Sequence, residues 1–119
     1  MYGRKKNKRK NTRSPVWEDI TATVHVDDQL SSIKKPKLKI HGRVRDIGAY
    51  GMFLVAGERV PVGSKAEIMI DFNPRQPGRS ALAAEGKTVR NDPEGIGIRF
   101  TRIDLAKLQQ CILDRMNSL

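Results

Sequence analysis

The sequence predicts a mainly β protein: a small antiparallel barrel of six strands, one C-terminal helix and a disordered basic N-terminal tail. Three observations predict this class. From residue 16 onward apolar and polar side chains alternate with a period of two, as in strands with one face on a core. No helical pattern separates the alternating runs, so a parallel sheet is excluded. A sheet of so few strands avoids unpaired edge strands by closing into a barrel. After Ile103 the period becomes helical.

The first 13 residues, MYGRKKNKRKNTR, carry seven basic side chains and no acid. The chain has a formal net charge of +10, whereas residues 14–119 hold 16 basic and 13 acidic residues. A segment of this composition buries little apolar surface and repels itself, so we expect 1–13 to be a flexible tail. By itself such a tail also suits a solubilising or polyanion-binding segment. Residues 14–119 are predicted to form a single domain, because 119 residues are too few for two ordinary ones.

Six runs have the composition and alternation of strands. They are ITATVHV (20–26), KLKIHGRVRD (37–46), YGMFLV (50–55), AEIMIDF (66–72), ALAAEGKTVR (81–90) and IGIRFT (96–101). Stretches rich in Pro, Gly, Asp and Ser separate them, as expected of turns. Between the last two runs, NDPEG is short enough to close an antiparallel hairpin.

One amphipathic helix is predicted over about 104–117. Asp104 is the expected N-cap. The predicted buried face recurs at helical spacing and consists of Leu105, Leu108, Ile112 and Met116. We expect this helix to pack on or across one opening of the barrel.

The sequence gives little support to catalysis, a metal or a cofactor. His25 and His41 fall on outward faces of predicted strands, without a Cys partner at metal-ligand spacing or a catalytic triad. Cys111, the single cysteine, is expected to be a small buried side chain. GIG at 95–97 lacks the third glycine of a dinucleotide fingerprint. We interpret its glycines as leaving space for the backbone within a strand. Without a signal-peptide pattern or an apolar run long enough to span a membrane, we expect a cytoplasmic protein.

Two short motifs stand about thirty residues apart. Arg9 and Arg13 are four residues apart just before the first strand, and Asp46, Gly48 and Gly51 follow in DIGAYG, where the second strand turns. This order resembles the PilZ domain family, which has RxxxR ahead of the first strand and [D/N]-x-S-x-x-G between the second and third. The family fold is a small antiparallel barrel with a C-terminal helix. GIGIRFTRID also looks like the closing strand of that family and the start of its helix.

The resemblance covers residues 9–119 and implies a stand-alone PilZ domain protein that binds the bacterial second messenger cyclic di-GMP. It implies that Arg9 and Arg13 contact guanine edges and phosphates and stack on the bases. Asp46 would accept hydrogen bonds from the guanine N1 and N2 hydrogens. Gly51 would let the turn adopt a positive φ and bring backbone N–H groups close to the ligand. Binding is expected to order the tail and so signal to an effector protein that the sequence does not identify.

Gly48 departs from the family pattern, which has serine there. Losing a hydroxyl bond to a charged group, about 1.5 to 3 kcal/mol, weakens binding roughly 10- to 150-fold. We expect the backbone N–H of Gly48 to remain as a donor. Tyr50 either compensates by stacking or through its hydroxyl, or packs in the barrel mouth. Lys8 and Lys10 are expected to add positive field rather than specificity.

Two alternatives stay open from the sequence. One is a diverged PilZ domain that binds a protein instead of cyclic di-GMP. The other, less favoured, is a basic barrel that binds nucleic acid. Such barrels present aromatic stacking platforms on their strands, whereas this chain has six aromatic residues, most of them in apolar runs.

Overall fold

The computed structural model describes residues 19–27, 38–73, 75 and 80–117, and within these ranges the chain forms six strands and one helix. The predicted tail lies outside the described residues. The same is true of four candidate binding residues, Lys8, Arg9, Lys10 and Arg13.

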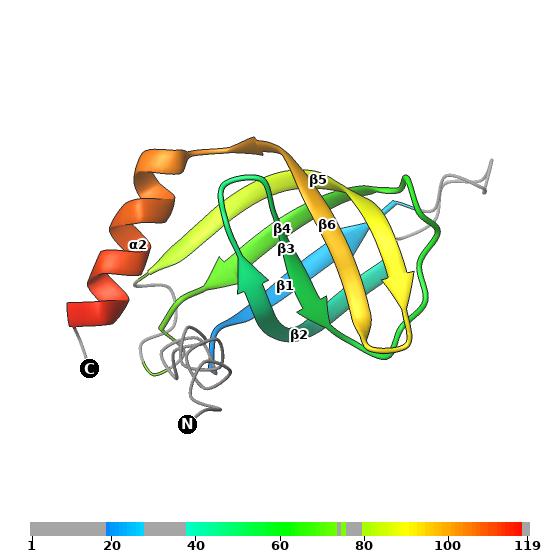
Figure 1. Ribbon diagram of the computed structural model, residues 1–119, viewed down its shortest axis with the longest axis horizontal. Coiled ribbons are helices and arrows are strands. Elements are labelled where there is room, and N and C mark those ends of the chain that lie inside the picture. Colours follow the sequence, from blue (N-terminus) through cyan, green and yellow to red (C-terminus); the bar gives the residue numbers. More distant parts are fainter. Residues whose placement is uncertain (1–18, 28–37, 74, 76–79, 118–119) are drawn as a thin grey trace, which may run out of the picture.

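The described strands form a closed antiparallel barrel in the order β1-β2-β3-β6-β5-β4 (Figure 1). The elements are β1 (Thr21–Val26), β2 (Leu38–Ile47), β3 (Gly51–Val55), β4 (Lys65–Asp71), β5 (Ala81–Asp92), β6 (Gly95–Ile103) and α2 (Leu105–Asn117). The predicted fold class is therefore confirmed. Closure leaves the backbone of each barrel strand with a hydrogen-bonded neighbour on both sides, which removes the open edges of a flat sheet.

The core fills the barrel interior because alternate side chains of each strand point inward. In β1 every second residue is buried, and β4 follows the same rule. The largest fully buried apolar side chains are Phe72, Ile20, Ile40, Leu54, Ile70, Leu82, Ile96, Val24 and Val44. This cluster fills the barrel interior, so the barrel encloses a packed core and not a channel.

The hairpin between β5 and β6 is confirmed. Asp92 pairs with Gly95, so only Pro93 and Glu94 form the turn. The backbone N–H of Glu94 donates to the Asp92 carboxylate over 3.2 Å, an Asx-type bond that closes the tight turn.

Helix α2 lies at one end of the barrel, and its N-cap is the predicted one (Figure 1). The Asp104 carboxylate accepts a hydrogen bond of 3.1 Å from the backbone N–H of Lys107. Within the described residues no helix has the length and apolar character needed to cross a membrane.

The predicted apolar face of the helix is partly wrong. Leu108 packs into the core as expected, but Leu105 and Met116 are more than half exposed. The helix instead buries Cys111 and Arg115 beside Leu108. The sequence pattern misses this rotation because Arg115 is a charged residue, and only its tertiary partners make its burial favourable.

Candidate functional site

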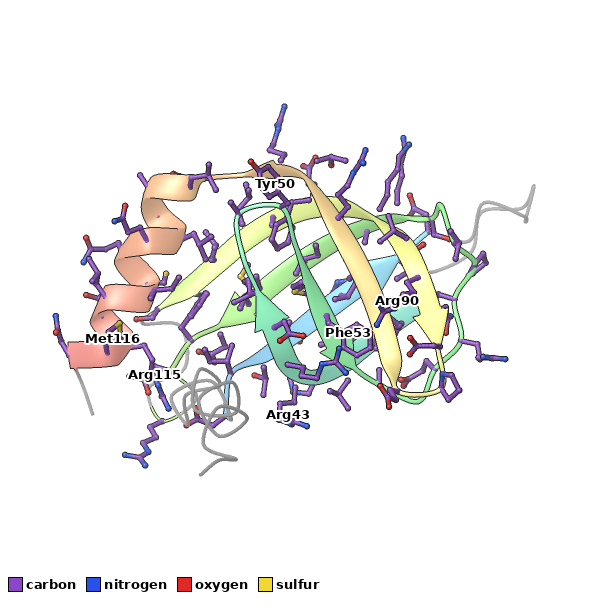
Figure 2. All side chains as sticks on the ribbon, viewed as in Figure 1. Arg43, Tyr50, Phe53, Arg90, Arg115 and Met116 are labelled. Carbon is purple, nitrogen blue, oxygen red and sulfur yellow. The ribbon has the colours of Figure 1, made fainter. Side chains whose placement is uncertain are left out.

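The turn between β2 and β3 is held by two backbone hydrogen bonds. The N–H of Gly48 donates to the carbonyl oxygen of Gly51 over 2.9 Å, and the N–H of Phe100 donates to the carbonyl oxygen of Tyr50 over 2.8 Å. The side chain of Tyr50 is 85% exposed and projects from this turn (Figure 2). Packing of Tyr50 in the barrel mouth is therefore excluded, and its ring is free to meet a ligand.

Gly51 is needed for close packing, not for an unusual backbone angle. Among the described residues Gly63 alone has a positive φ, so the expectation for Gly51 was wrong. A Cβ at position 51 would lie well inside van der Waals contact of the Ile98 carbonyl oxygen, because β3 and β6 approach closely there. Glycine at 51 lets the turn lie flat against β6.

Gly48 has open space around it. A Cβ built at this position meets no atom within 4 Å, so a serine fits without moving the backbone. The backbone N–H, however, is already donated to Gly51. The expectation that this N–H serves a ligand was wrong, and Gly48 lines the site without offering a free donor.

A β-bulge in β2 brings Arg45 and Asp46 together on the outer wall. The pairing of β2 with β3 shifts between Val44 and Asp46, so Arg45 and Asp46 both oppose Phe53. Nε of Arg45 donates to Oδ2 of Asp46 over 3.0 Å, and Nη1 of Arg45 donates to Oε1 of Glu94 over 3.3 Å. The bulge thus places a carboxylate and a guanidinium at the end of β2, beside the turn.

A second bulge, in β5, places another arginine on the same wall. The pairing of β5 with β6 shifts between Thr88 and Arg90, which turns Val89 and Arg90 outward while Thr88 stays buried. Cζ of Arg45 lies 3.9 Å from the centroid of the Phe53 ring, and Cζ of Arg90 lies 5.0 Å from it. Both are cation–π contacts. Figure 2 shows Phe53 and Arg90 side by side on the barrel wall.

These side chains surround an open hollow of about 440 Å³. Its volume falls within the range of small-molecule sites, about 300 to 1,000 Å³. The polar and glycine residues that line it are Arg45, Asp46, Gly48, Gly51, Arg90 and Gly97. The structure therefore brings the three described residues of the second motif together around one hollow.

The described chain begins next to this wall. The backbone N–H of Val44 donates to the carbonyl oxygen of Ile20 over 2.8 Å, so the start of β1 lies against the part of β2 that leads to Asp46. One residue earlier, the carboxylate of Asp19 forms an ion pair with Arg115 of α2. The first described residue is thus held on α2 and the second on β2.

Comparison with protein families decides what kind of domain carries this hollow. The model of the PilZ domain matches residues 7–114. The chain belongs to the PilZ domain family. Neither the comparison with curated proteins nor that with solved structures gave a match. PilZ domains are ligand-binding receptor domains that bind cyclic di-GMP, and they are not known as an enzyme family.

Sequence reasoning missed Arg45, Phe53 and Arg90 in this PilZ domain. A signal for Phe53 was present, because a period of two puts it on the face opposite Met52 and Leu54, which are core residues. An outward aromatic beside the motif turn indicates a surface feature. The arginines had no comparable signal, since their meeting over Phe53 depends on two bulges.

The residues set aside as non-functional have ordinary surroundings. His41 is exposed and its Nδ1 lies 2.9 Å from the Thr23 hydroxyl, while His25 is half-buried on the outer face of β1. Cys111 is buried as predicted, and burial raises the pKa of its thiol above the usual 9.0. Within the described ranges no group of three metal-ligating side chains gathers.

A second open hollow, of about 490 Å³, lies on another part of the PilZ barrel wall. Its charged lining mixes Glu67, Glu85 and Asp104 with Arg102, and His25 stands at its side. Two glutamates that oppose each other across β4 and β5 disfavour an anionic ligand. The smaller hollow beside Gly51 is therefore the better candidate for a nucleotide, although it is not the larger of the two.

Proposed function

We propose that this PilZ domain is a receptor for cyclic di-GMP and that the nucleotide lies in the hollow beside the β2–β3 turn. The observation that carries the proposal is that the second motif lines this hollow near the start of the described chain. Asp46, Gly48 and Gly51 line the hollow, and the chain that bears Arg9 and Arg13 joins the barrel beside the same part of β2.

Chain length supports the proposal that the first motif reaches the same hollow. Arg13 precedes Asp19 by six residues and Arg9 precedes it by ten. At about 3.3 to 3.6 Å per residue, these segments span up to about 20 Å and about 35 Å. Both arginines are therefore within reach of the hollow from the point where the described chain begins.

The chemistry of the residues matches the ligand. In the proposed complex Arg9 and Arg13 donate in a forked geometry to guanine O6 and N7 and to the phosphates. The Asp46 side chain is 55% exposed, so its carboxylate still presents acceptor positions to guanine N1 and N2 while it is paired with Arg45. In the proposed complex Lys8 and Lys10 add positive electrostatic potential around the ligand. This receptor acts in the cytoplasm without catalysis, metal or resident cofactor.

Isothermal titration calorimetry with cyclic di-GMP tests the proposal. We expect the unmodified protein to bind, Arg9→Ala and Arg13→Ala each to abolish detectable binding, and Lys5→Ala to retain it. Lys5 is the matched control because it removes one positive charge from the same segment. Binding that survives both arginine substitutions would refute the proposed site, and no binding by the unmodified protein would refute the function.

Position 48 offers a gain-of-affinity test. Gly48→Ser restores the hydroxyl of the family pattern at a place where a Cβ meets no other atom within 4 Å. We expect cyclic di-GMP to bind roughly 10- to 150-fold more tightly, the effect of one hydrogen bond to a charged group. Gly48→Ala is the control, since it adds the carbon without the hydroxyl. Equal affinities of the two variants would contradict a direct role for the hydroxyl.

We further infer that binding is signalled to an effector protein through Asp19 and Arg115. When the N-terminal segment becomes ordered on the ligand, it shifts Asp19, and the ion pair between Asp19 and Arg115 passes this shift to α2. Hydrogen exchange of the α2 amides should change when cyclic di-GMP binds the unmodified protein, and that change should be lost in Asp19→Asn. An unaltered response in Asp19→Asn would rule out this route.

A protein-interaction module without a nucleotide is the second candidate function. The observation that favours it is that Gly48 supplies neither a hydroxyl nor a free N–H to the hollow. The same titration separates the two, because this candidate predicts no heat of binding with cyclic di-GMP. A nucleic-acid barrel, by contrast, predicts binding of linear RNA that falls steeply with salt.

A further inference from the structure

Phe53 occupies an unusual position for a buried aromatic residue. Its neighbours Met52 and Leu54 belong to the barrel core, so Phe53 lies on the outer wall, yet it is only 6% exposed. The two arginines that bulges in β2 and β5 bring over the ring supply the cover. The ring and the two guanidinium groups over it form a cationic part of the wall that lines the hollow.

Glycine in β6 makes this arrangement possible. Gly97 is the cross-strand partner of Phe53 on one side and of Arg90 on the other. A Cβ at position 97 would come within 3.2 Å of Cβ of Arg90, so a larger residue would crowd the arginine and require a small shift of it. The absence of a side chain on β6 opens the floor of the hollow and lets Arg90 approach Phe53 across the strand.

The contacts of Arg90 orient its side chain but leave several of its N–H donors without a partner among the described residues. Its Nε donates to Oδ2 of Asp92 over 3.0 Å, which fixes the plane of the guanidinium. Its side chain is 57% exposed, and within the described residues its Nη atoms have no hydrogen-bond partner. These nitrogens therefore remain available to a ligand in the hollow, as a pre-oriented pair of donors.

Arg90 and the motif turn line the same hollow from different strands. Asp46, Gly48 and Gly51 come from β2, β3 and their turn, whereas Arg90 comes from β5, beyond β6. Arg45 is less free to bind, because it already donates to both Asp46 and Glu94. Of the two arginines on Phe53, Arg90 has more donors to spare and the more exposed side chain.

A pre-oriented guanidinium distinguishes the two purine bases. Guanine presents two acceptors, O6 and N7, to a forked donor, whereas adenine presents a donor, its N6 amino group, in place of O6. Lysine carries the same charge without the planar fork and stacks less well on a ring. An arginine at this place thus favours guanine over adenine, and lysine does so less.

We propose that Arg90, held over Phe53, is a specificity-determining residue of the nucleotide site: it binds one guanine of the ligand and selects against adenine. The assignment rests on the proposed function and extends it to strand β5, outside both family motifs. Phe53 acts as the positioning residue that holds the guanidinium so that its Nη donors are directed to the ligand.

Calorimetry with cyclic di-GMP and with cyclic di-AMP tests this assignment in the full chain. We expect Arg90→Ala to weaken binding of cyclic di-GMP by about 5- to 150-fold and to lower the preference for it over cyclic di-AMP. Arg90→Lys should recover part of the affinity but not the preference. Lys87→Ala is the matched control: it removes an exposed positive charge three residues earlier on β5, at a position that does not line the hollow.

The outcomes are distinguishable. If the unmodified protein binds and Arg90→Ala behaves as Lys87→Ala does, the role of Arg90 is refuted while the proposed function stands. If Arg90→Ala weakens both nucleotides equally, Arg90 supplies charge alone and the assignment of specificity is wrong. Absence of binding by the unmodified protein overturns the proposed function and this assignment with it. Thermal melting of each variant checks that the barrel is intact.

Discussion

The two sides of this barrel are built differently. On one side, β1 and β4 alternate strictly, with every second residue in the core and the others on the outer face. On the other, Met52, Phe53 and Leu54 are buried in succession in β3, and four consecutive residues from Gly95 are buried in β6. The second side therefore buries residues on its outer face as well as on its inner face.

Bulges account for this difference. The pairings of β1 with β2 and with β4 run without a register shift, whereas the β2–β3 pairing shifts at Arg45 and the β5–β6 pairing shifts between Glu85 and Gly86 and again at Val89. The shifts at Arg45 and at Val89 each bring an arginine to the outer wall, and these two arginines lie over Phe53. The regular side supplies stability, and the irregular side forms the candidate site.

Ile70 in β4 should show the largest stability effect. Ile70→Ala removes a fully buried side chain from the regular side, so we expect the free energy of unfolding to fall by about 2 to 5 kcal/mol. Met69→Ala is the matched control, because Met69 is the next residue, lies on the outer face and is 48% exposed. Urea denaturation measures both. A loss in Ile70→Ala no larger than that in Met69→Ala would contradict this division of the barrel.

Gly51 and Gly48 should respond in opposite ways to the same change. Gly51→Ala forces a carbon against the Ile98 carbonyl oxygen, so we expect a loss of about 1 to 3 kcal/mol in unfolding free energy. Gly48→Ala meets open space and restricts the unfolded chain, so we expect no loss and a gain of up to about 1 kcal/mol. Equal effects at the two positions would show that the turn relaxes around either side chain.

Cys111 should have the smallest effect, and only at alkaline pH. Burial raises its pKa in the folded protein, with opposition from Lys107, so the unfolded chain loses the thiol proton first as pH rises. Cys111 therefore leaves the free energy of unfolding unchanged below about pH 9, the usual pKa of a thiol, and lowers it above that pH. Chemical denaturation from pH 7 to 10 should show unmodified protein losing stability relative to Cys111→Ala. If the stability difference between the two proteins is constant across this pH range, the proposed effect of the thiol is contradicted.

Several features of the fold were predictable because their causes are local. The period of two marked the strands, Asp104 marked the helix start, and the short NDPEG segment marked the β5–β6 hairpin. The helix face was less predictable. Leu105 and Met116 match an apolar stripe in sequence, but the helix turns Arg115 inward because Asp19 lies close enough to pair with it.

The candidate site was only half predictable, and the two motif glycines show why. Sequence placed Gly48 and Gly51 at one turn, and the structure puts both on the hollow. The sequence did not show that position 51 must be glycine because it lies against the Ile98 carbonyl oxygen. Nor did it show that the N–H of Gly48 already donates to Gly51. The first fact depends on β6 lying beside β3, although β6 begins forty positions after β3 ends, and the second depends on the backbone geometry that the turn adopts.

The sequence by itself determined the strands, the helix, the family and the turn that carries Asp46, because these depend on local periodicity and short motifs. Tertiary structure alone decided that β3 pairs with β6 and that bulges in β2 and β5 turn two arginines over Phe53. A bulge is a mismatch between two paired strands, and neither strand records it alone. For that physical reason Arg45 and Arg90 join the candidate site only when the barrel closes.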